Sequence, residues 1–430
     1  MLRAVKPTLL VVGALTTILL DGLAREAAAI PAFARKYRTS CTTCHVAIPK
    51  RNAFGEAFRR NGYQIPAGDE RYIKEEPVSL GAEAWKEMWP DAIWPGAIPG
   101  TFPLAAYVHQ RFVFDGPTDD KEFDAPHELE LLFGNTLGRN VGFFGEWVAY
   151  EKGVNAPGLK RFFIQFSNLF EKRLGKAVSL RVGRFEPGIA DGYKDADRIT
   201  MEHPITLDYR VTSAFRVRDA QSGVELAGVP HRRFEYVLGL VNGQGVSVND
   251  PDNDKDVYAR AGFKFGGMGL DGSGGPEGEE LVIANNYVDN SVMLGFYGYW
   301  GVATQTDSNR VAFRNEFRRF GVDARVNFGR NYLLAGVVRG RDDNPSNTSA
   351  RDVDSTAWFV EMDRVFKPWI IGVVRYERLE IDGKPDLTQV VPNLTLLARA
   401  NIRFTLEAFL QPSLDEDKFR TFKANVLFVF

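Results

Sequence analysis

The sequence predicts an all-β protein, namely a transmembrane antiparallel β-barrel of about 16 strands preceded by a small α-helical segment. Two observations predict the barrel. From about residue 101 to the end, short segments alternate apolar and polar residues with the period of two that is typical of strands. The connections between these segments alternate between short and long, which is the arrangement found in outer-membrane barrels. A cysteine motif near the N-terminus sets the small segment apart.

The composition excludes several classes of protein before any motif is considered. The chain has 430 residues, enough for two or three globular domains or for one large barrel with a small module. Beyond residue 20, no apolar run reaches the roughly 20 residues that a membrane-spanning helix needs. The net charge of -2 gives no reason to expect a nucleic-acid partner, and two cysteines are too few for a disulfide-stapled fold.

The first 29 residues have the pattern of a secretion signal. Arg3 and Lys6 form a basic start, residues 8–20 are apolar, and residues 27–29 are three alanines that offer a cleavage site. An uncleaved N-terminal anchor is the alternative. We expect cleavage before Ile30 and a mature chain outside the cytoplasm, where a free pair of cysteines needs an explanation.

The two cysteines belong to the stretch Cys41-Thr42-Thr43-Cys44-His45, which has the spacing of a c-type haem attachment site. The chemistry fixes this spacing, because two thiols add to the two vinyl groups of the porphyrin and the adjacent histidine then lies below the iron. The motif therefore predicts one covalent haem c, bound by Cys41 and Cys44, with His45 as the proximal iron ligand.

Three other interpretations of the motif compete with haem attachment. A thioredoxin-like redox pair needs a strand-to-helix junction in a βαβ unit, which the sequence does not predict. A zinc site needs a second pair of ligands nearby, and the chain has no third cysteine. A chance occurrence would use both cysteines of a secreted chain.

The predicted haem segment, residues 30–75, is too short to enclose its own cofactor. Within it, residues 51–62 predict a short helix with Phe54 and Phe58 on one face, packed either on the porphyrin or in an ordinary core. A basic collar could hold the haem propionates or an acidic partner, with a solvated helical face as the alternative. Its seven members are Arg35, Lys36, Arg38, Lys50, Arg51, Arg59 and Arg60.

The sequence leaves the distal ligand of the haem iron open. No methionine or histidine follows His45 until Met88, in the predicted linker 76–100, which makes Met88 our candidate. A methionine in this position would raise the haem potential and a second histidine would lower it. The other candidates, none of which has a local motif, are His109, His127, His203 and His231.

The predicted barrel, residues 101–430, contains sixteen segments with the length of a tilted spanning strand. The span 266–290 is long where a short turn is due, so an extra strand over 280–288 is an alternative. Short connections include 138–140, 329–331 and 366–368, whereas long ones, expected to be outer loops, include 115–126, 186–209, 246–256 and 341–354. The strands are expected to begin near residues 101, 127, 140, 160, 176, 211, 232, 256, 291, 313, 331, 355, 369, 389, 402 and 418.

The end of the chain and the size of the barrel make two further predictions. Alternating apolar positions lead to the terminal Phe430, as in the assembly signal of outer-membrane barrels. A secreted β-propeller, the soluble alternative, needs a repeat of about 40 to 50 residues, and none is found. Because a barrel of about 16 strands encloses an aqueous lumen, we expect the haem segment to plug that lumen.

The residues around the motif resemble a known family. Phe33-Ala34-Arg35, the Cys41 motif, the stretch NAFGEAF at 52–58 and Asn61-Gly62-Tyr63 follow one another as in the fused monohaem cytochrome–porins, whose best-known members are outer-membrane iron oxidases. The resemblance implies a 16-stranded barrel and electron transfer from external Fe(II) through the haem to a periplasmic carrier. The chain departs from the iron oxidases after the haem histidine, where residues 46–49 (VAIP) replace a His-Phe-Gln-like stretch.

Together these observations predict an electron conduit in the outer membrane of a Gram-negative bacterium. It would exchange electrons between an external donor or acceptor, with Fe(II) as the leading donor, and a periplasmic cytochrome or other carrier. With iron as donor it would be an Fe(II):cytochrome c oxidoreductase whose redox chemistry belongs to the cofactor. Outer-membrane lipids are the other expected partner. The alternatives are a porin gated by the haem plug and a haem enzyme such as a peroxidase.

Overall fold

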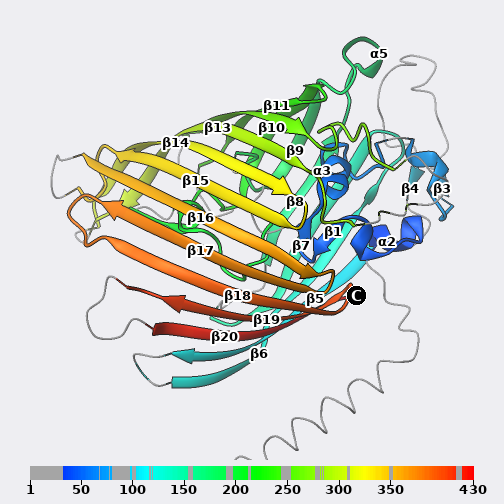
Figure 1. Ribbon diagram of the computed structural model, residues 1–430. Coiled ribbons are helices and arrows are strands. Elements are labelled where there is room, and N and C mark those ends of the chain that lie inside the picture. Colours follow the sequence, from blue (N-terminus) through cyan, green and yellow to red (C-terminus); the bar gives the residue numbers. More distant parts are fainter. Residues whose placement is uncertain are drawn as a thin grey trace, which may run out of the picture.

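A closed barrel of sixteen antiparallel strands forms most of the computed structural model (Figure 1). Each strand pairs with its neighbours in sequence, and the last pairs with the first, so that the sheet has no open edge. The predicted fold class and strand number are confirmed. The structure describes residues 32–66, 68–76, 78–79, 97–98, 103–115, 118, 120–153, 158–189, 197–211, 215–243, 253–276, 281, 283, 285–307, 310–347, 352–412 and 419–430.

Most barrel strands begin within a few residues of the predicted positions. Two do not: β6 starts earlier because residues 120–124 pair with 111–115 of β5, and β10 starts later because the preceding connection is longer than expected. The strands are β5 (Leu104–Asp115), β6 (Asp120–Thr136), β7 (Val141–Glu151), β8 (Gly158–Phe166), β9 (Ser179–Phe185), β10 (Gln221–His231), β11 (Phe234–Val241), β12 (Asp256–Gly266), β13 (Ser291–Thr306), β14 (Ala312–Phe328), β15 (Asn331–Asp342), β16 (Val353–Lys367), β17 (Ile370–Ile381), β18 (Leu387–Arg399), β19 (Ile402–Leu410) and β20 (Phe419–Val429).

The C-terminus closes the barrel against its first strand. Strand β20 runs antiparallel to β5, from Thr421 opposite Asp115 to Val429 opposite Tyr107. The backbone of Phe430 then exchanges two hydrogen bonds with Ala106, of 3.0 and 2.6 Å. The terminal phenylalanine thus completes the seam of the barrel.

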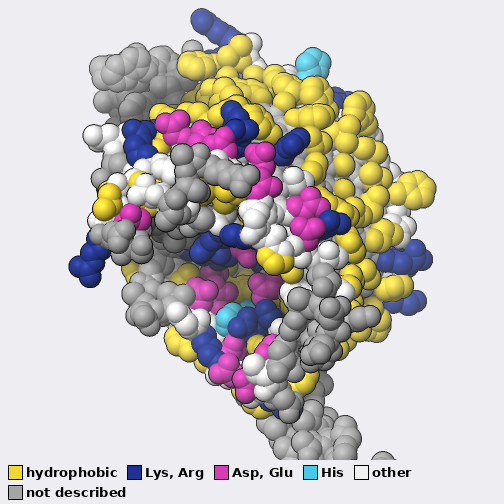
Figure 2. Space-filling model, turned by 90° about the vertical axis from the view of Figure 1, so that its left-hand side faces the viewer, with side chains coloured by type: hydrophobic (Ala, Val, Ile, Leu, Met, Phe, Trp, Pro, Cys, Tyr) yellow, Lys and Arg dark blue, Asp and Glu magenta, His cyan; other side chains and the backbone are white. Residues whose placement is uncertain are grey.

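The two faces of the wall carry different side chains, as the period of two requires. On β16, Glu361 and Asp363 point inward and are buried, whereas Val360 and Met362, which alternate with them, point outward and are 40% exposed. The same alternation leaves many large apolar side chains on the outside, seen as the yellow surface in Figure 2. An apolar exterior around a polar lumen is the arrangement of a barrel that contacts membrane lipid.

The connections sort into two ends. The tight turns 138–140 and 329–330 lie at the end where the chain terminates, with glycine at positive φ in each (Gly138, 89°; Gly329, 56°). The extra strand considered over 280–288 is wrong for the described residues there, which form turn and coil. β12 and β13 pair directly, with Gly266 opposite Ser291, and leave no place between them.

The connection between β9 and β10 leaves the wall at the end opposite the tight turns, as predicted for an outer loop at 186–209. Its described residues nevertheless fold into the lumen, where the apolar side chains of Ile189, Ile199 and Leu207 are fully buried. Carboxylates of the wall accept its backbone amides: Glu407 from Met201 at 2.9 Å and Glu377 from Ile205 at 3.1 Å. The loop includes the short helix α6 (Ile205–Asp208), and α5 (Glu171–Leu174) lies in another turn.

The N-terminal segment occupies the barrel end that carries the tight turns (Figure 1). The predicted helix is confirmed as α3, capped by Asn52, whose side chain accepts the Gly55 amide at 2.8 Å. None of the described helices is long and apolar enough to cross a membrane. The predicted signal, Met88 and most of the linker lie outside the described residues. The elements are α2 (Ala32–Tyr37), η1 (Cys41–Thr43), β1 (His45–Ala47), β2 (Lys50–Arg51), α3 (Ala53–Arg60), η2 (Asp69–Arg71), β3 (Val78–Ser79) and β4 (Ala97–Ile98).

Candidate functional site

The cysteine motif forms a single tight turn. The side chain of Ser40 accepts the amide of Thr42 at 3.3 Å, and the amide of Cys44 donates to the carbonyl of Cys41 at 3.2 Å. Both cysteines are free thiols and partly exposed. The short chain between them therefore presents two thiols one turn apart, directly before His45.

His45 begins strand β1 and is held by its own hairpin. Its Nδ1 lies 3.0 Å from the carbonyl oxygen of Pro49, which fixes the orientation of the ring. Burial, assisted by the charge of Arg51, lowers the pKa of His45 to about 4. The imidazole is therefore neutral at pH 7, which is the form that binds a metal ion.

Helix α3 packs directly on the motif. A Cβ atom at Gly55 would lie 2.2 Å from the carbonyl oxygen of Cys44, so a side chain has no room there. The Asn52 amide group donates to the carbonyl of Thr43 at 3.0 Å, and its backbone N–H donates to that of Cys44 at 2.9 Å. Sequence reasoning missed these two positioning residues, although a glycine inside a short helix and an asparagine before it were visible signals.

An apolar cluster lies beside Cys44. Phe54 and Phe58 both belong to it, as their shared helix face predicts, and Phe33 contacts Phe58 edge-on at a ring distance of 5.2 Å. These rings already make ordinary core contacts, and contact with a porphyrin remains a prediction. The buried members are Tyr37, Phe54, Phe58, Ile65 and Tyr72, with Phe33, Cys44, Tyr63, Ile73, Met268, Leu281 and Ile283 packed against them.

The residues of the motif fit a covalent haem better than a thiol redox pair. Strands β1 and β2 pair antiparallel, unlike a βαβ unit. Burial raises the pKa of Cys41, and burial together with Cys41 raises that of Cys44 to about 12, whereas redox pairs carry thiolates of lowered pKa. Among the residues that the structure describes, no three His, Cys, Asp or Glu side chains are grouped to hold a bare metal ion.

Five of the seven members of the basic collar contact the barrel or its internal loop. Lys50 binds Asp363 of the wall at 2.5 Å, with both side chains buried, and Arg60 binds Glu235 at 2.7 Å. Three further members of the collar donate hydrogen bonds to the barrel or its internal loop. Lys36 donates to Thr136 at 2.7 Å, Arg35 to the carbonyl of Leu104 at 2.6 Å, and Arg51 to Asp197 of the internal loop at 2.5 Å. These cations fasten the segment inside the barrel.

The tip of the segment meets the internal loop inside the barrel. Val46 and Ala47 share one buried cluster with Ile189 and Ile199. Arg403 of β19 joins all three parts, since its guanidinium donates to the carbonyls of Ile48 at 2.7 Å and Ile199 at 2.8 Å. These contacts place the tip of the segment inside the barrel, which is the position predicted for a plug.

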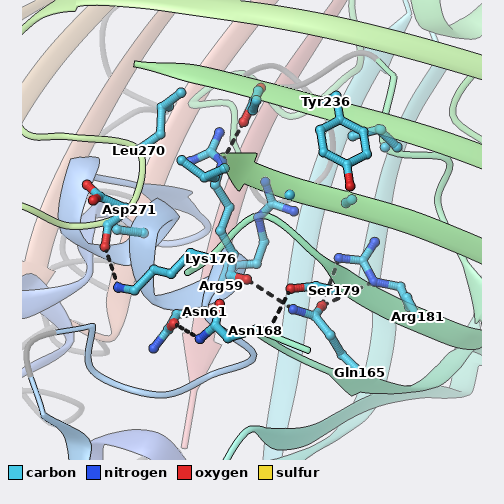
Figure 3. A pocket seen from close by; sticks show the side chains of 18 of the residues that line it. Arg59, Asn61, Gln165, Asn168, Lys176, Ser179, Arg181, Tyr236, Leu270 and Asp271 are labelled. Carbon is cyan, nitrogen blue, oxygen red and sulfur yellow. Dashed lines mark hydrogen bonds and ion pairs between the residues drawn. The ribbon is translucent and has the colours of Figure 1, made fainter. Parts of the chain in front are cut away.

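Two narrow cavities lie beside the segment, between helix α3 or strand β2 and the described wall. One cavity of about 60 Å³ is crossed by hydrogen bonds from the wall to the segment (Figure 3). Asn168 donates to Asn61 at 2.8 Å and Gln165 to the carbonyl of Arg60 at 3.1 Å. A second cavity of about 50 Å³ lies beside Lys50. Figure 2 shows the opposite mouth as a hollow in which charged side chains of both signs gather.

The four histidines considered as distal ligands lie elsewhere. His109 is hydrogen-bonded to Asn425 at 2.9 Å, and its ring meets that of His127 edge-on, with 4.9 Å between the ring centres. His231 ends strand β10, and the carbonyl of His203 faces Arg375. In the part of the chain that the structure describes, none of these four histidines belongs to the apolar cluster beside Cys44.

Solved structures of outer-membrane porins share the barrel fold. The anion-selective porin of Comamonas acidovorans is 11% identical, with 77% of this chain and 99% of that chain covered and a TM-score of 0.53. In vitro folded OmpT, an outer-membrane protein of Vibrio cholerae, is 12% identical over 79% and 99%, with a TM-score of 0.53. The outer-membrane channel DcaP of Acinetobacter baumannii is 9% identical over 76% and 96%, with a TM-score of 0.50.

No protein-family model matches the chain, and no curated protein does. The similarity to porins, at these identities, concerns the fold. Together with the closed barrel and its apolar exterior, it agrees with the predicted location in the outer membrane of a Gram-negative bacterium.

Proposed function

We propose that the chain is an outer-membrane electron conduit, in which Cys41, Cys44 and His45 bind one haem c inside a porin-like barrel. One observation carries the proposal. Two free thiols and a neutral imidazole with the required spacing lie beside an apolar cluster, in a segment docked within the lumen. When bound, haem supplies one-electron transfer, and the chain's own residues position it and exclude water.

The placement of the segment suits exchange with a periplasmic carrier. Short turns mark the periplasmic end of outer-membrane barrels, and the segment lies at the end with short turns. The hollow at the opposite mouth would admit a small external donor or acceptor (Figure 2). Fe(II) is the leading donor because of the resemblance to the iron-oxidising cytochrome–porins.

The contacts of the segment disfavour the alternative of a gated porin. A gate has to leave the lumen, and leaving would expose or unpair Lys50, Arg60 and the wall carboxylates that they bind. Breaking one buried pair costs about 3–5 kcal/mol when its partner stays buried. With several such contacts, the segment is a fixed part of the lumen, which favours passage of electrons over passage of solutes.

A visible spectrum of the detergent-purified mature protein tests the proposal. We expect a c-type band that survives acid–acetone extraction, because the haem is held by two thioethers. Reduction of this band by Fe(II) supports inward electron flow. Reduction by dithionite alone indicates a low-potential haem and outward flow, and absence of any haem band contradicts the proposal.

A further inference from the structure

We infer that Met268, in the turn between β12 and β13 of the barrel, is the second axial ligand of the haem. The inference rests on the proposed function and deepens it, because it gives the barrel a direct part in setting the haem potential. It also gives a role to the span 266–290, which is long at an end of the barrel where the turns are otherwise short.

The turn between β12 and β13 lies over the cysteine motif. The side chain of Asn286 donates to the carbonyls of Thr42 at 3.0 Å and of His45 at 2.6 Å. The carbonyl of Leu281 accepts from the hydroxyl of Thr43 at 3.4 Å. The side chains of Leu281 and Ile283 pack on the apolar cluster. A barrel element thus covers the motif that the short segment cannot cover itself.

Met268 begins this turn and is held in place by its backbone. Its amide donates to Asp289 Oδ1 at 2.9 Å, and its carbonyl accepts from Arg233 at 3.4 Å. Its side chain is half-buried and packs on the apolar cluster that also contacts Cys44. The thioether lies over Gly275, since a Cβ atom there would be 3.5 Å from Sδ.

The other methionines that the structure describes lie elsewhere. Met201 Sδ accepts from Arg403 at 2.8 Å in the internal loop, Met293 is buried in strand β13, and Met362 points outward on β16. None of the four histidines outside the motif packs on this cluster. Among the described methionines and the histidines outside the motif, Met268 is therefore the one that packs on the apolar cluster beside Cys44.

The chemistry of a thioether suits this position. It is neutral and polarizable, so it can lie in an apolar cluster without a charge to compensate. Opposite a histidine it raises the reduction potential of a haem, which favours acceptance of an electron from an external donor. Met88, the candidate from the sequence, lies outside the described residues, and replacing it separately distinguishes the two.

The test compares Met268→Leu, Met268→His and Met88→Leu in the haem-loaded full-length protein, with Met362→Leu as the matched control on the outer face. Covalent haem content and heat-modifiable migration on gels report folding. Oxidised wild-type protein is expected to show the far-red band of a sulfur–iron bond. Met268→Leu should lose this band and lower the potential, and Met268→His should keep a six-coordinate haem at a lower potential.

The outcomes separate this inference from the proposed function. A wild-type protein without covalent haem overturns both. A haem-loaded wild type without the sulfur band overturns the inference alone. The same follows if Met268→Leu keeps the band and the potential of the wild type, or if Met88→Leu loses them instead.

Discussion

The barrel wall and the N-terminal segment are stabilised in different ways. In the wall, sixteen strands pair in a closed ring, so every strand has hydrogen-bonded neighbours on both sides. The apolar exterior of this ring suits contact with membrane lipid. The segment has two short helices, of six and eight residues, and five buried apolar side chains in its own cluster. So small a core rarely supports a fold by itself. The segment therefore depends on the wall, whereas the hydrogen-bonded ladder of the wall closes without strands from the segment.

The contacts between the two regions show where this dependence lies. The wall offers carboxylates such as Asp363 and Glu235, and the segment offers Lys50 and Arg60. Within the wall itself, similar pairs cross between strands, for example Arg260 of β12 with Asp323 of β14 and Arg375 of β17 with Glu361 of β16. The cations of the segment thus pair with wall carboxylates in the same way as the cations of the wall do.

Loss of both cysteines should have the largest effect and should affect only the segment. The variant Cys41→Ser/Cys44→Ser removes both thioether bonds, so we expect no covalent haem, measured as the mass of the intact protein. Heat-modifiable migration should stay as in the wild type, because the barrel ladder does not involve the motif. A variant that no longer forms the barrel would contradict the independence of the wall.

Removal of a wall carboxylate should loosen the segment next most strongly. Asp363→Ala leaves Lys50 buried without its partner, which costs about 3–5 kcal/mol. We expect faster proteolysis of the segment and higher ion conductance in planar bilayers. The double variant Lys50→Met/Asp363→Leu should recover both properties, and Arg364→Ala, on the outer face of the same strand, should change neither. If the single and double variants behave alike, the pair does not dock the segment.

A glycine pair tests the close packing of α3 on the motif. Gly55→Ala places a Cβ atom against the Cys44 carbonyl, an overpacking that we expect to cost about 1–3 kcal/mol and to reduce haem incorporation. Gly158→Ala in β8 is the matched control, because nothing lies within 4 Å of its Cβ position. Equal haem content in the two variants would show that the helix can move away from the motif.

The smallest expected effect is a dependence on acid pH. Burial alone would raise the pKa of Glu56, but Arg51, Arg59 and Arg60 hold it well below its usual range. A carboxylate with a lowered pKa stabilises the folded segment above its ordinary value of 4.5, and this contribution is lost as the pH falls toward the folded value. Proteolysis of the segment should therefore be constant near neutral pH and rise only in acid. Glu56→Gln should flatten this profile.

The periodic parts of the structure could be predicted from the sequence, and the parts that depend on distant contacts could not. Alternation along the wall predicts strands such as β16, and the Cys41 motif predicts its own turn, because both patterns are local. The internal loop has no such pattern. Its backbone amides at Met201 and Ile205 are bound by Glu407 and Glu377, which lie 206 and 172 residues further along the chain.

The candidate site shows the same division. Cys41, Cys44 and His45 are contiguous and readable in sequence. The bond of Lys50 to Asp363 spans 313 residues, and that of Asn286 to His45 spans 241. A basic collar therefore looked like a surface for propionates or a partner, because the carboxylates that neutralise it belong to strands far along the chain.

The most direct test of the central claim is electron transfer across a vesicle membrane. Haem-loaded protein is inserted into liposomes that contain oxidised cytochrome c and a small fluorescent dye, and Fe(II) is added outside. The account predicts that the enclosed cytochrome is reduced while the dye stays inside, with neither change in Cys41→Ser/Cys44→Ser vesicles. Release of the dye without reduction of the cytochrome would contradict it and would leave a solute channel.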